Sequence, residues 1–338
     1  MEDKKMEEKL LNVSSSPHVR DNSSTKSIMR DVVIALIPAT LVGIYNFRIS
    51  ALLVILTTCV TCVLSEYIWQ RCMKQPVTTN DFSALLTGLL LALNLPATIP
   101  LWMCVIGGVF AIIVAKQMFG GLGQNFMNPA LAGRCFMMLS FSSAMTSFTI
   151  KEGSNFLYGI AVDASSSATP LMQVKEAAST GGSLPDLMKM FLGTTTGTIG
   201  ETSAAAILLG AAYLLVRRII DWKIPACYIG SFMIFNLLYS CVSGGMATSP
   251  YPIFFELCGG GLLLGAFFMA TDYVTSPITP KGKVIFGILL GLLTGLFRFF
   301  GESAEGVSFA IIIGNLCVPL IERFTVPKAF GKEGKANE

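Results

Sequence analysis

The stretch from Ala51 to Leu64 reads ALLVILTTCVTCVL and contains no charged residue. With its flanks it forms a mainly apolar run at 50–70, and about 20 such residues are enough for a helix to cross the core of a bilayer. Similar runs recur along the chain, whose 338 residues are 53% hydrophobic and 13% charged, whereas a soluble domain carries about a quarter charged residues. The sequence therefore predicts an all-α integral membrane protein.

Ten membrane spans are predicted, five on each side of a polar region that contains Thr169. The first five lie at 30–47, 50–70, 82–95, 100–116 and 127–143, and the second five at 202–220, 224–241, 254–271, 283–299 and 307–323. Because five is an odd number, the second set would cross the membrane in the opposite sense to the first. Glu66, near the end of the second span, is expected to reach the membrane interface with its carboxylate.

The two sets of spans resemble each other, which favours two inverted five-helix repeats. TGLLL at 87–91 parallels GGLLL at 260–264, and Lys116 before a Phe-Gly pair parallels Arg298 before another. The alternative is chance recurrence of glycine and leucine in apolar helices. Inverted repeats are common in transporters and place binding sites where the repeats meet.

Basic residues predict the orientation, because lysine and arginine concentrate on the cytoplasmic side. With the amino terminus inside, most basic residues of the loops fall inside, whereas Arg48, Glu302 and Glu305 fall outside. Both termini are then cytoplasmic, in a plasma or inner membrane, and the Thr169 region is extracytoplasmic. The predicted divisions are a disordered tail at 1–28, a first repeat at 29–143, an outer region at 144–200, a second repeat at 201–325 and a tail at 326–338.

Several classes of site are not expected. Cys59 and Cys62 form a CxxC inside an apolar run with no second pair nearby, so they are interpreted as packing residues. The one histidine, His18, lies in the tail, so neither a metal centre nor a histidine-dependent triad is predicted. A net charge of +3 gives no indication of nucleic-acid binding. The polar tail lacks the pattern of a cleavable signal peptide.

The polar region contains a dense run of hydroxyl groups, DASSSATPL at 163–171. Ala168 leaves the Thr169 hydroxyl approachable, and Pro170 favours an extended backbone at Thr169. An exposed hydroxyl on an extended segment suits a modifying enzyme. An ordinary serine-rich loop is the alternative, since such composition needs no function.

This run resembles the motif Asp-x-x-Ser/Thr-Gly/Ser-Ala-Thr, at which a flavin transferase attaches FMN to threonine through a phosphoester. Asp163, Ser166, Ala168 and Thr169 match the motif, and Ser167 stands where glycine is commoner. The resemblance implies covalent FMN on Thr169 in the 144–200 region.

A glycine- and threonine-rich loop precedes the sixth span. Gly197, Gly200 and Glu201 lie in it, and free backbone N–H groups at the start of the following helix favour a phosphate or a flavin edge. The alternative is a simple helix cap made by Thr198 or Thr202.

Three acidic residues are candidates for an ion path. Asp272 closes the eighth span, where an ionisable residue at membrane depth suggests function, although a helix C-terminal turn is the alternative. Glu302 and Glu305 lie between the last two spans and either line an ion exit or serve as interfacial anchors.

Taken together, five motifs in order resemble the family that unites the D subunit of the Rnf electron-transport complex with its relative, the B subunit of the sodium-translocating NADH:quinone oxidoreductase. They are the flavinylation-like run, GTIGETS at 197–203, FMATD at 268–272, EGVSFA at 305–310 and PLIE at 319–322. The short tail favours the Rnf branch, and Glu322 departs from an aspartate that is frequent there.

The resemblance implies a subunit that relays electrons between reduced ferredoxin and NAD+, coupled to Na+ or H+ transport. It implies covalent FMN and a second, noncovalent riboflavin. It also implies a lipid bilayer, the A, B, C, E and G subunits of the Rnf complex, and a flavin transferase as partners. A cofactor-free secondary transporter with inverted repeats is the alternative function, and a scaffold for other subunits is a third.

Overall fold

The computed structural model describes residues 24–148, 169–174, 186–193, 195, 197–243, 251–301 and 306–327. Throughout these segments the regular structure is helical, and the one β-bridge recorded there joins Pro96 to Thr198. Five of the described helices are long and apolar enough to cross a membrane, and two shorter apolar helices accompany them. The predicted all-α class is confirmed for this part of the chain.

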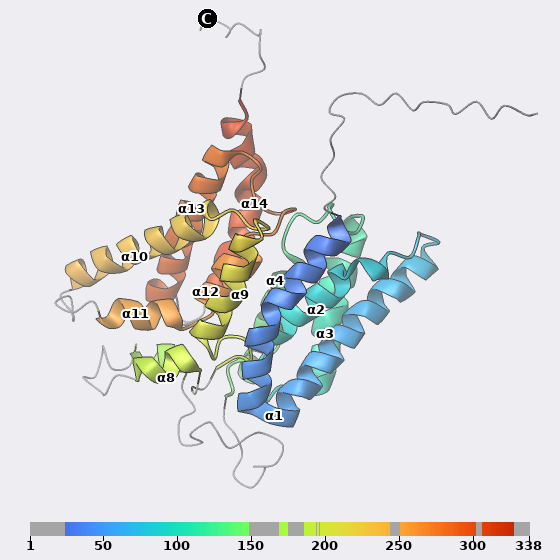
Figure 1. The fold of residues 1–338 in the computed structure, drawn as a ribbon, viewed down its shortest axis with the longest axis horizontal. Helices are drawn as coiled ribbons and strands as arrows, with labels where there is room; N and C mark the ends of the chain where they lie inside the picture. Colours follow the sequence, from blue (N-terminus) through green and yellow to red (C-terminus); the bar gives the residue numbers. More distant parts are fainter. Residues whose placement is uncertain are drawn as a thin grey trace, which may run out of the picture.

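Helix α1 (Thr25–Cys72) contains the first two predicted spans. Ser24 caps it, and its side chain accepts a hydrogen bond from the Ser27 N–H. The helix bends sharply at Arg48, whose φ of 51° and ψ of −131° are not helical. Figure 1 shows the result as two blue limbs that meet at an acute turn. The turn thus separates the two spans without a loop.

The rest of the first half is made of shorter helices. Helix α2 (Ser83–Leu93) is almost wholly buried, and α3 (Leu101–Val109) continues into a π-helical segment, Phe110–Val114. Helix α4 (Pro129–Ser140) is followed by the single turn α5 (Ser142–Met145). Asn128 caps α4, and proline at the first position suits a helix start because its missing N–H would have no partner there.

The second half begins after the short helix α8 (Leu187–Leu192). Its helices are α9 (Ala204–Val216), α10 (Lys223–Ser243), α11 (Tyr251–Cys258), α12 (Leu262–Leu264), a π-helical segment at Gly265–Met269, α13 (Pro280–Phe300) and α14 (Val307–Thr325). The predicted continuous span at 254–271 is broken, because Gly260 and Gly261 have φ of 63° and 66°. Only glycine adopts this conformation without steric cost.

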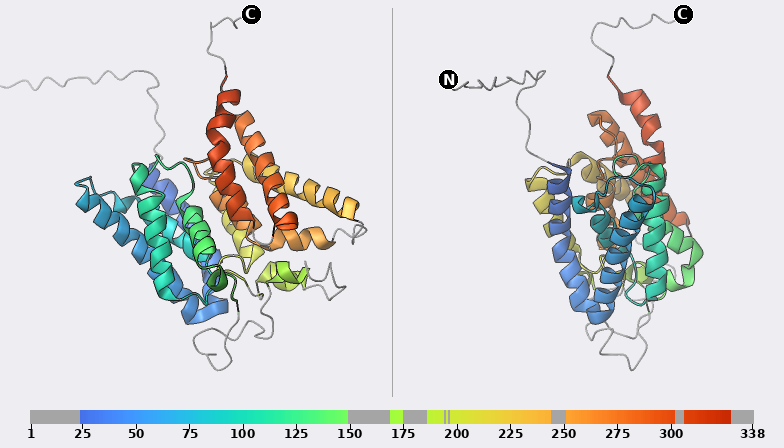
Figure 2. Two further views of the ribbon diagram at one scale, coloured as in Figure 1. Left: turned by 180° about the vertical axis from the view of Figure 1, so that it is seen from behind. Right: turned by 90° about the vertical axis from the view of Figure 1, so that its right-hand side faces the viewer.

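The two halves lie side by side as two bundles (Figures 1 and 2). Helix α9 packs on α1, and α14 packs on α4. At the first of these contacts, a Cβ atom on Gly210 would overlap the Ala35 carbonyl oxygen, so the backbones touch directly. In Figure 1 the start of α1 and the end of α14 lie at the upper side of the molecule, and α8 lies at the opposite side. We call these the tail side and the α8 side.

Candidate functional site

Thr169 lies at the edge of a cavity on the α8 side. The expected exposed hydroxyl is wrong: Thr169 is buried, with 6% of the residue exposed, because Met190 of α8 and the glycines after α11 surround it. Residues 170–174 form a helical turn after it. Its hydroxyl accepts one long hydrogen bond, 3.4 Å from the Met172 nitrogen. The cavity has a volume of about 330 Å³ and is lined by Thr169, Pro170, Leu171, Met190, Thr195, Gly197, Glu201, Cys258, Gly259 and Gly260. We call it the Thr169 pocket.

One wall of the Thr169 pocket is the break between α11 and α12. Gly259 and Gly260 form this wall, and Arg298 of α13 reaches both of their carbonyl oxygens with Nη2, at 2.9 and 3.0 Å. Its Nη1 donates to the carboxylate and the backbone carbonyl of Glu256, at 2.9 and 2.6 Å. Arg298 is 3% exposed, so a buried cation sits directly behind the glycine wall.

A second buried ion pair adjoins the same pocket. Glu201, which lines the pocket, lies 3.4 Å from Nη2 of Arg134, and Arg134 donates from Nη1 to Asn94 at 2.5 Å. A Cβ atom on Gly261 would collide with the Glu201 carboxylate. Glu201 is therefore fixed between the helix break of the second half and α4 of the first half, and its charge is compensated inside the protein.

The predicted flavin-site residues separate into three groups. Thr169, Gly197 and Glu201 come together in the pocket, although 28 or more positions divide the first from the others. Gly200 instead packs against α2, because a Cβ there would lie 2.7 Å from the Leu93 Cβ. The motif residues Asp163, Ser166, Ser167 and Ala168 lie outside the described residues, as do Glu302 and Glu305 of the predicted ion path.

The alternative interpretation of this loop, a cap of the sixth span by Thr198 or Thr202, is wrong. Ser203 caps α9, and its hydroxyl accepts from the Ala206 N–H at 3.2 Å. Thr198 instead pairs with Pro96, and the next two residues donate backbone hydrogen bonds to Leu95 and Leu93. The loop before α9 is thus anchored on the end of α2, which leaves Gly197 facing the pocket.

A group joined to the Thr169 hydroxyl would extend along the side of the pocket formed by Gly197. A Cβ atom on Gly197 would meet no atom within 4 Å, so the pocket is open at that wall. The Thr169 hydroxyl borders the cavity, so a group joined to this oxygen would start at the cavity wall. The Thr169 hydroxyl, Gly197 and the glycine wall would hold the group, and the two ion pairs would fix that wall.

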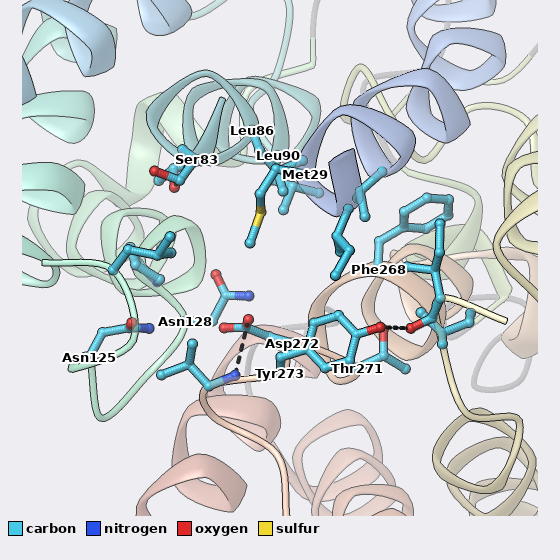
Figure 3. A pocket seen from close by; sticks show the side chains of 18 of the residues that line it. Met29, Ser83, Leu86, Leu90, Asn125, Asn128, Phe268, Thr271, Asp272 and Tyr273 are labelled. Atoms are coloured by element: carbon cyan, nitrogen blue, oxygen red, sulfur yellow. Dashed lines mark hydrogen bonds between the residues drawn. The ribbon is translucent and has the colours of Figure 1, made fainter. Parts of the chain in front are cut away.

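A larger pocket, of about 740 Å³, lies between the two halves on the tail side. It is bounded by the first turns of α1, by α2, by the loop before α4, and by the π-helical segment with the linker after it. Figure 3 shows the Asp272 carboxylate and the Asn128 amide next to each other on one wall. We call it the inner pocket.

Asp272, the predicted ion-path residue, belongs to the inner pocket. Its carboxylate accepts hydrogen bonds from the Val274 N–H at 3.5 Å and the Thr275 hydroxyl at 3.2 Å. Asn128, beside it, donates to the Met269 carbonyl at 3.3 Å and also caps α4. The pocket is therefore built from the start of α4 and the end of the broken span, one from each half.

The prediction that Glu66 reaches the interface is wrong. Glu66 is 1% exposed and accepts two hydrogen bonds from Lys116, at 3.0 and 3.1 Å, and one from Gln117 at 2.7 Å. Lys116 also donates to Ser83 at 2.6 Å and lines the inner pocket. The buried ion pairs of Lys116, Arg134 and Arg298 were not predicted, although each of these basic residues lies inside a predicted span. A charged side chain inside a membrane is energetically costly unless it is paired, so this position is the signal that could have identified them.

Comparison with known proteins agrees with these features. The model of the NQR2, RnfD, RnfE family matches residues 12–331. The D subunit of the Na+-translocating ferredoxin:NAD+ oxidoreductase complex of Acetobacterium woodii is 44% identical over 98% of this chain and 100% of that protein. The D subunit of the proton-translocating ferredoxin:NAD+ oxidoreductase complex of Clostridium ljungdahlii is 42% identical over 98% and 99%.

A third relative is more distant. The D subunit of the ion-translocating oxidoreductase complex of Aliivibrio salmonicida is 36% identical over 94% of this chain and 98% of that protein. A family match over most of the chain, with similarity spanning nearly the full length of these relatives, confirms the resemblance seen in the motifs. The chain belongs to the NQR2, RnfD, RnfE family.

Proposed function

We propose that this chain is the D subunit of an Rnf complex, an ion-translocating ferredoxin:NAD+ oxidoreductase, and relays electrons coupled to Na+ or H+ transport. The similarity to D subunits of such complexes, at 42–44% identity, supports the assignment. Because the relatives are named for different ions, the similarity favours neither Na+ nor H+. The chain acts as one subunit and is not expected to be active alone.

The observation that carries the redox part of the proposal is the position of Thr169. A threonine inside a flavinylation-like motif borders a cavity that also contains Gly197 and Glu201 from a second motif of the family resemblance. FMN joined to this hydroxyl through a phosphoester would supply one- and two-electron chemistry, while the protein supplies position and electrostatics. Asp163, Ser166, Ser167 and Ala168 would serve recognition by the flavin transferase.

The arrangement of the two halves supports inverted five-helix repeats. Helices α1 and α4, at the two ends of the first set of spans, contact α9 and α14, which hold the same places in the second set. Lys116 and Arg298, which the sequence aligns, are both buried and both paired with a glutamate. One pair adjoins the inner pocket and the other the Thr169 pocket, as an inverted arrangement requires.

The same geometry supports the proposed orientation. The start of α1 and the end of α14 share the tail side, and α8 lies at the opposite side. Thr169 lines one pocket with Met190 of α8. We propose that the protein lies in a plasma or inner membrane with its tail side toward the cytoplasm. The FMN on Thr169 then lies on the extracytoplasmic side. The A, B, C, E and G subunits of the complex are the proposed protein partners.

The inner pocket is the site we propose for the second, noncovalent flavin, riboflavin. Its mixed lining of apolar side chains with Asn125 and Asn128 suits a ring with polar edges. Asp272 on the same wall is the candidate for an ion path that continues to Glu302 and Glu305. Unchanged Na+ uptake into vesicles after replacement of all three carboxylates would remove them from the path.

A cofactor-free secondary transporter is the alternative function. A pocket between two halves, with a carboxylate in its wall, is also what such a carrier would have. The two functions differ in what they require of Thr169, because a carrier needs no group on that hydroxyl.

The test uses the whole complex in membrane vesicles, made in a host with a flavin transferase. We expect Thr169→Ala to abolish both ferredoxin-dependent reduction of NAD+ and the associated ion uptake. Thr61→Ala is the matched control, because it removes a threonine hydroxyl that bonds the Thr57 carbonyl within α1. Normal NAD+ reduction by an assembled Thr169→Ala complex would contradict the redox role.

A further inference from the structure

Arg298 holds the wall of the Thr169 pocket by an unusual set of contacts. One guanidinium bonds the backbone carbonyls of Glu256, Gly259 and Gly260 and the Glu256 carboxylate. Helix α11 ends at Cys258 and α12 begins at Leu262, so these carbonyls belong to a helix end and a non-helical link. Carbonyls at such an end lack partners within the helix and need a donor from elsewhere.

We propose that Arg298 is a positioning residue of the Thr169 pocket. Its guanidinium ties the α11–α12 break to α13 and so holds the glycine wall in the shape that receives a flavin attached to Thr169. The claim that the wall receives a flavin rests on the proposed function, whereas the claim that Arg298 holds the wall in place does not.

The geometry leaves little freedom for another arrangement. A Cβ atom on Gly260 would lie 2.7 Å from Nη2 of Arg298 and 2.7 Å from the Leu171 Cδ2 atom, so the link is held between the guanidinium and the residues after Thr169. The guanidinium also stacks near Phe232, with 5.0 Å between its Cζ atom and the ring centroid. Lysine offers one point charge and cannot bond all four acceptors in this planar pattern.

The first experiment needs no flavin. Cys258 lines the Thr169 pocket, so the rate at which a membrane-permeant maleimide labels it, read by peptide mass spectrometry, reports the state of the wall. In whole protein made without a flavin transferase, we expect Arg298→Gln to raise this rate roughly tenfold, which corresponds to about 1.4 kcal/mol of opening free energy. Arg298→Lys should give a smaller increase, because it restores the charge without the bonding pattern.

Lys283→Gln is the matched control. It removes another cation of α13, one that pairs with Asp221 at 3.1 Å and is partly exposed at the opposite end of the helix. We expect Cys258 labelling in this variant to equal that of the wild type. Gly260→Ala is the second test variant, because its Cβ atom would displace the glycine wall from Arg298 while the charges of Arg298 and Glu256 are kept. We expect its rate of Cys258 labelling to match that of Arg298→Gln.

The second experiment reads the flavin itself, in protein made with the transferase. Covalent flavin measured after denaturation should be equal in wild type and Arg298→Gln, because attachment depends on the 163–169 motif. In the folded protein, iodide should quench the flavin of Arg298→Gln more strongly than that of the wild type or Lys283→Gln.

The outcomes separate the two proposals. Wild-type Cys258 labelling in folded Arg298→Gln and Gly260→Ala would overturn the positioning role, whatever the flavin does. Equal iodide quenching in Arg298→Gln and wild type would likewise overturn it. If wild-type protein carries no covalent flavin while the labelling rates differ as expected, the proposed function fails and the positioning of the wall stands.

Discussion

Single residues show how this chain keeps charge inside an apolar fold. Lys116 and Glu66 have side chains that are 2% and 1% exposed, and they form an ion pair in which each charge compensates the other. Removing an ion from water costs several kcal/mol, so a buried charge persists only with a close partner and further hydrogen bonds. Gln117 and Ser83 supply those hydrogen bonds here.

Replacing Lys116 by methionine should therefore destabilise the protein strongly. The change leaves the Glu66 carboxylate buried without its cation, and loss of one partner of a buried pair costs about 3–5 kcal/mol. Thermal unfolding in a mild detergent measures the effect. Lys283→Met is the control, because its pair with Asp221 is partly exposed and such surface pairs are worth about 0–1 kcal/mol.

The double variant Lys116→Met with Glu66→Gln completes this test. With both charges gone, most of the lost stability should return, because no uncompensated ion stays buried. A Lys116→Met protein as stable as Lys283→Met would show that the pair is not buried in the way described.

For single residues, the sequence placed three candidate site residues together but did not predict how the buried charges pair. Thr169, Gly197 and Glu201 were expected in one site, and they line one pocket. The role assigned to Glu66 was wrong because its partner Lys116 is 50 positions away, and hydropathy carries no information on such a contact. The cap of α9 at Ser203 was missed because the sequence does not fix the residue at which the helix begins, although serine is a better cap than threonine.

Among the elements, α1 depends on one residue with positive φ. Arg48 is exposed and has φ of 51° with ψ of −131°, a sparsely populated conformation that costs a non-glycine residue about 1–3 kcal/mol. Arg48→Gly should therefore raise the unfolding temperature by a few degrees, and Arg48→Val should lower it, because a β-branched residue tolerates positive φ least.

The measurement is again thermal unfolding, with circular dichroism as the probe. A fall in stability for Arg48→Gly as large as that for Arg48→Val would mean that the guanidinium, rather than the backbone conformation, supports the turn. The sequence predicted two spans here but not a turn without a loop, because Arg48 carries no glycine or proline signal. The break in the eighth span has such a signal, three consecutive glycines.

The whole molecule depends on the close contact of its two halves. Gly210 of α9 touches the Ala35 backbone of α1, and a Cβ on Gly43 would lie 2.6 Å from the Ile199 carbonyl oxygen. Small residues at such crossings let helix backbones approach in membranes, where hydrophobic association between helices is absent.

Gly210→Leu should push the halves apart. We expect a loss of about 1–3 kcal/mol or more from overpacking, seen as a lower unfolding temperature and a broader size-exclusion peak. Gly230→Ala is the control, because a Cβ there meets no atom within 4 Å and alanine favours a helix over glycine by about 0.5–1 kcal/mol. Equal stability of both variants would contradict direct packing of α9 on α1.

At the scale of the molecule, the sequence predicted the class and the family. It also predicted two sets of spans, and the described residues form two adjacent bundles. The full lining of the two pockets was not predicted, since each needs residues from distant segments, and only a three-dimensional arrangement brings these together. The inverted relation of the halves stays a proposal that the paired buried cations support.

The most direct measurement is in-gel flavin fluorescence of the denatured, purified protein, with wild type beside Thr169→Ala. Both are made in a host that expresses an active flavin transferase, which a known flavinylated protein verifies in the same cells. We expect fluorescence that survives denaturation in the wild type and is absent from Thr169→Ala. A wild-type protein without fluorescence, or a Thr169→Ala protein that retains it, would contradict a covalent flavin at Thr169.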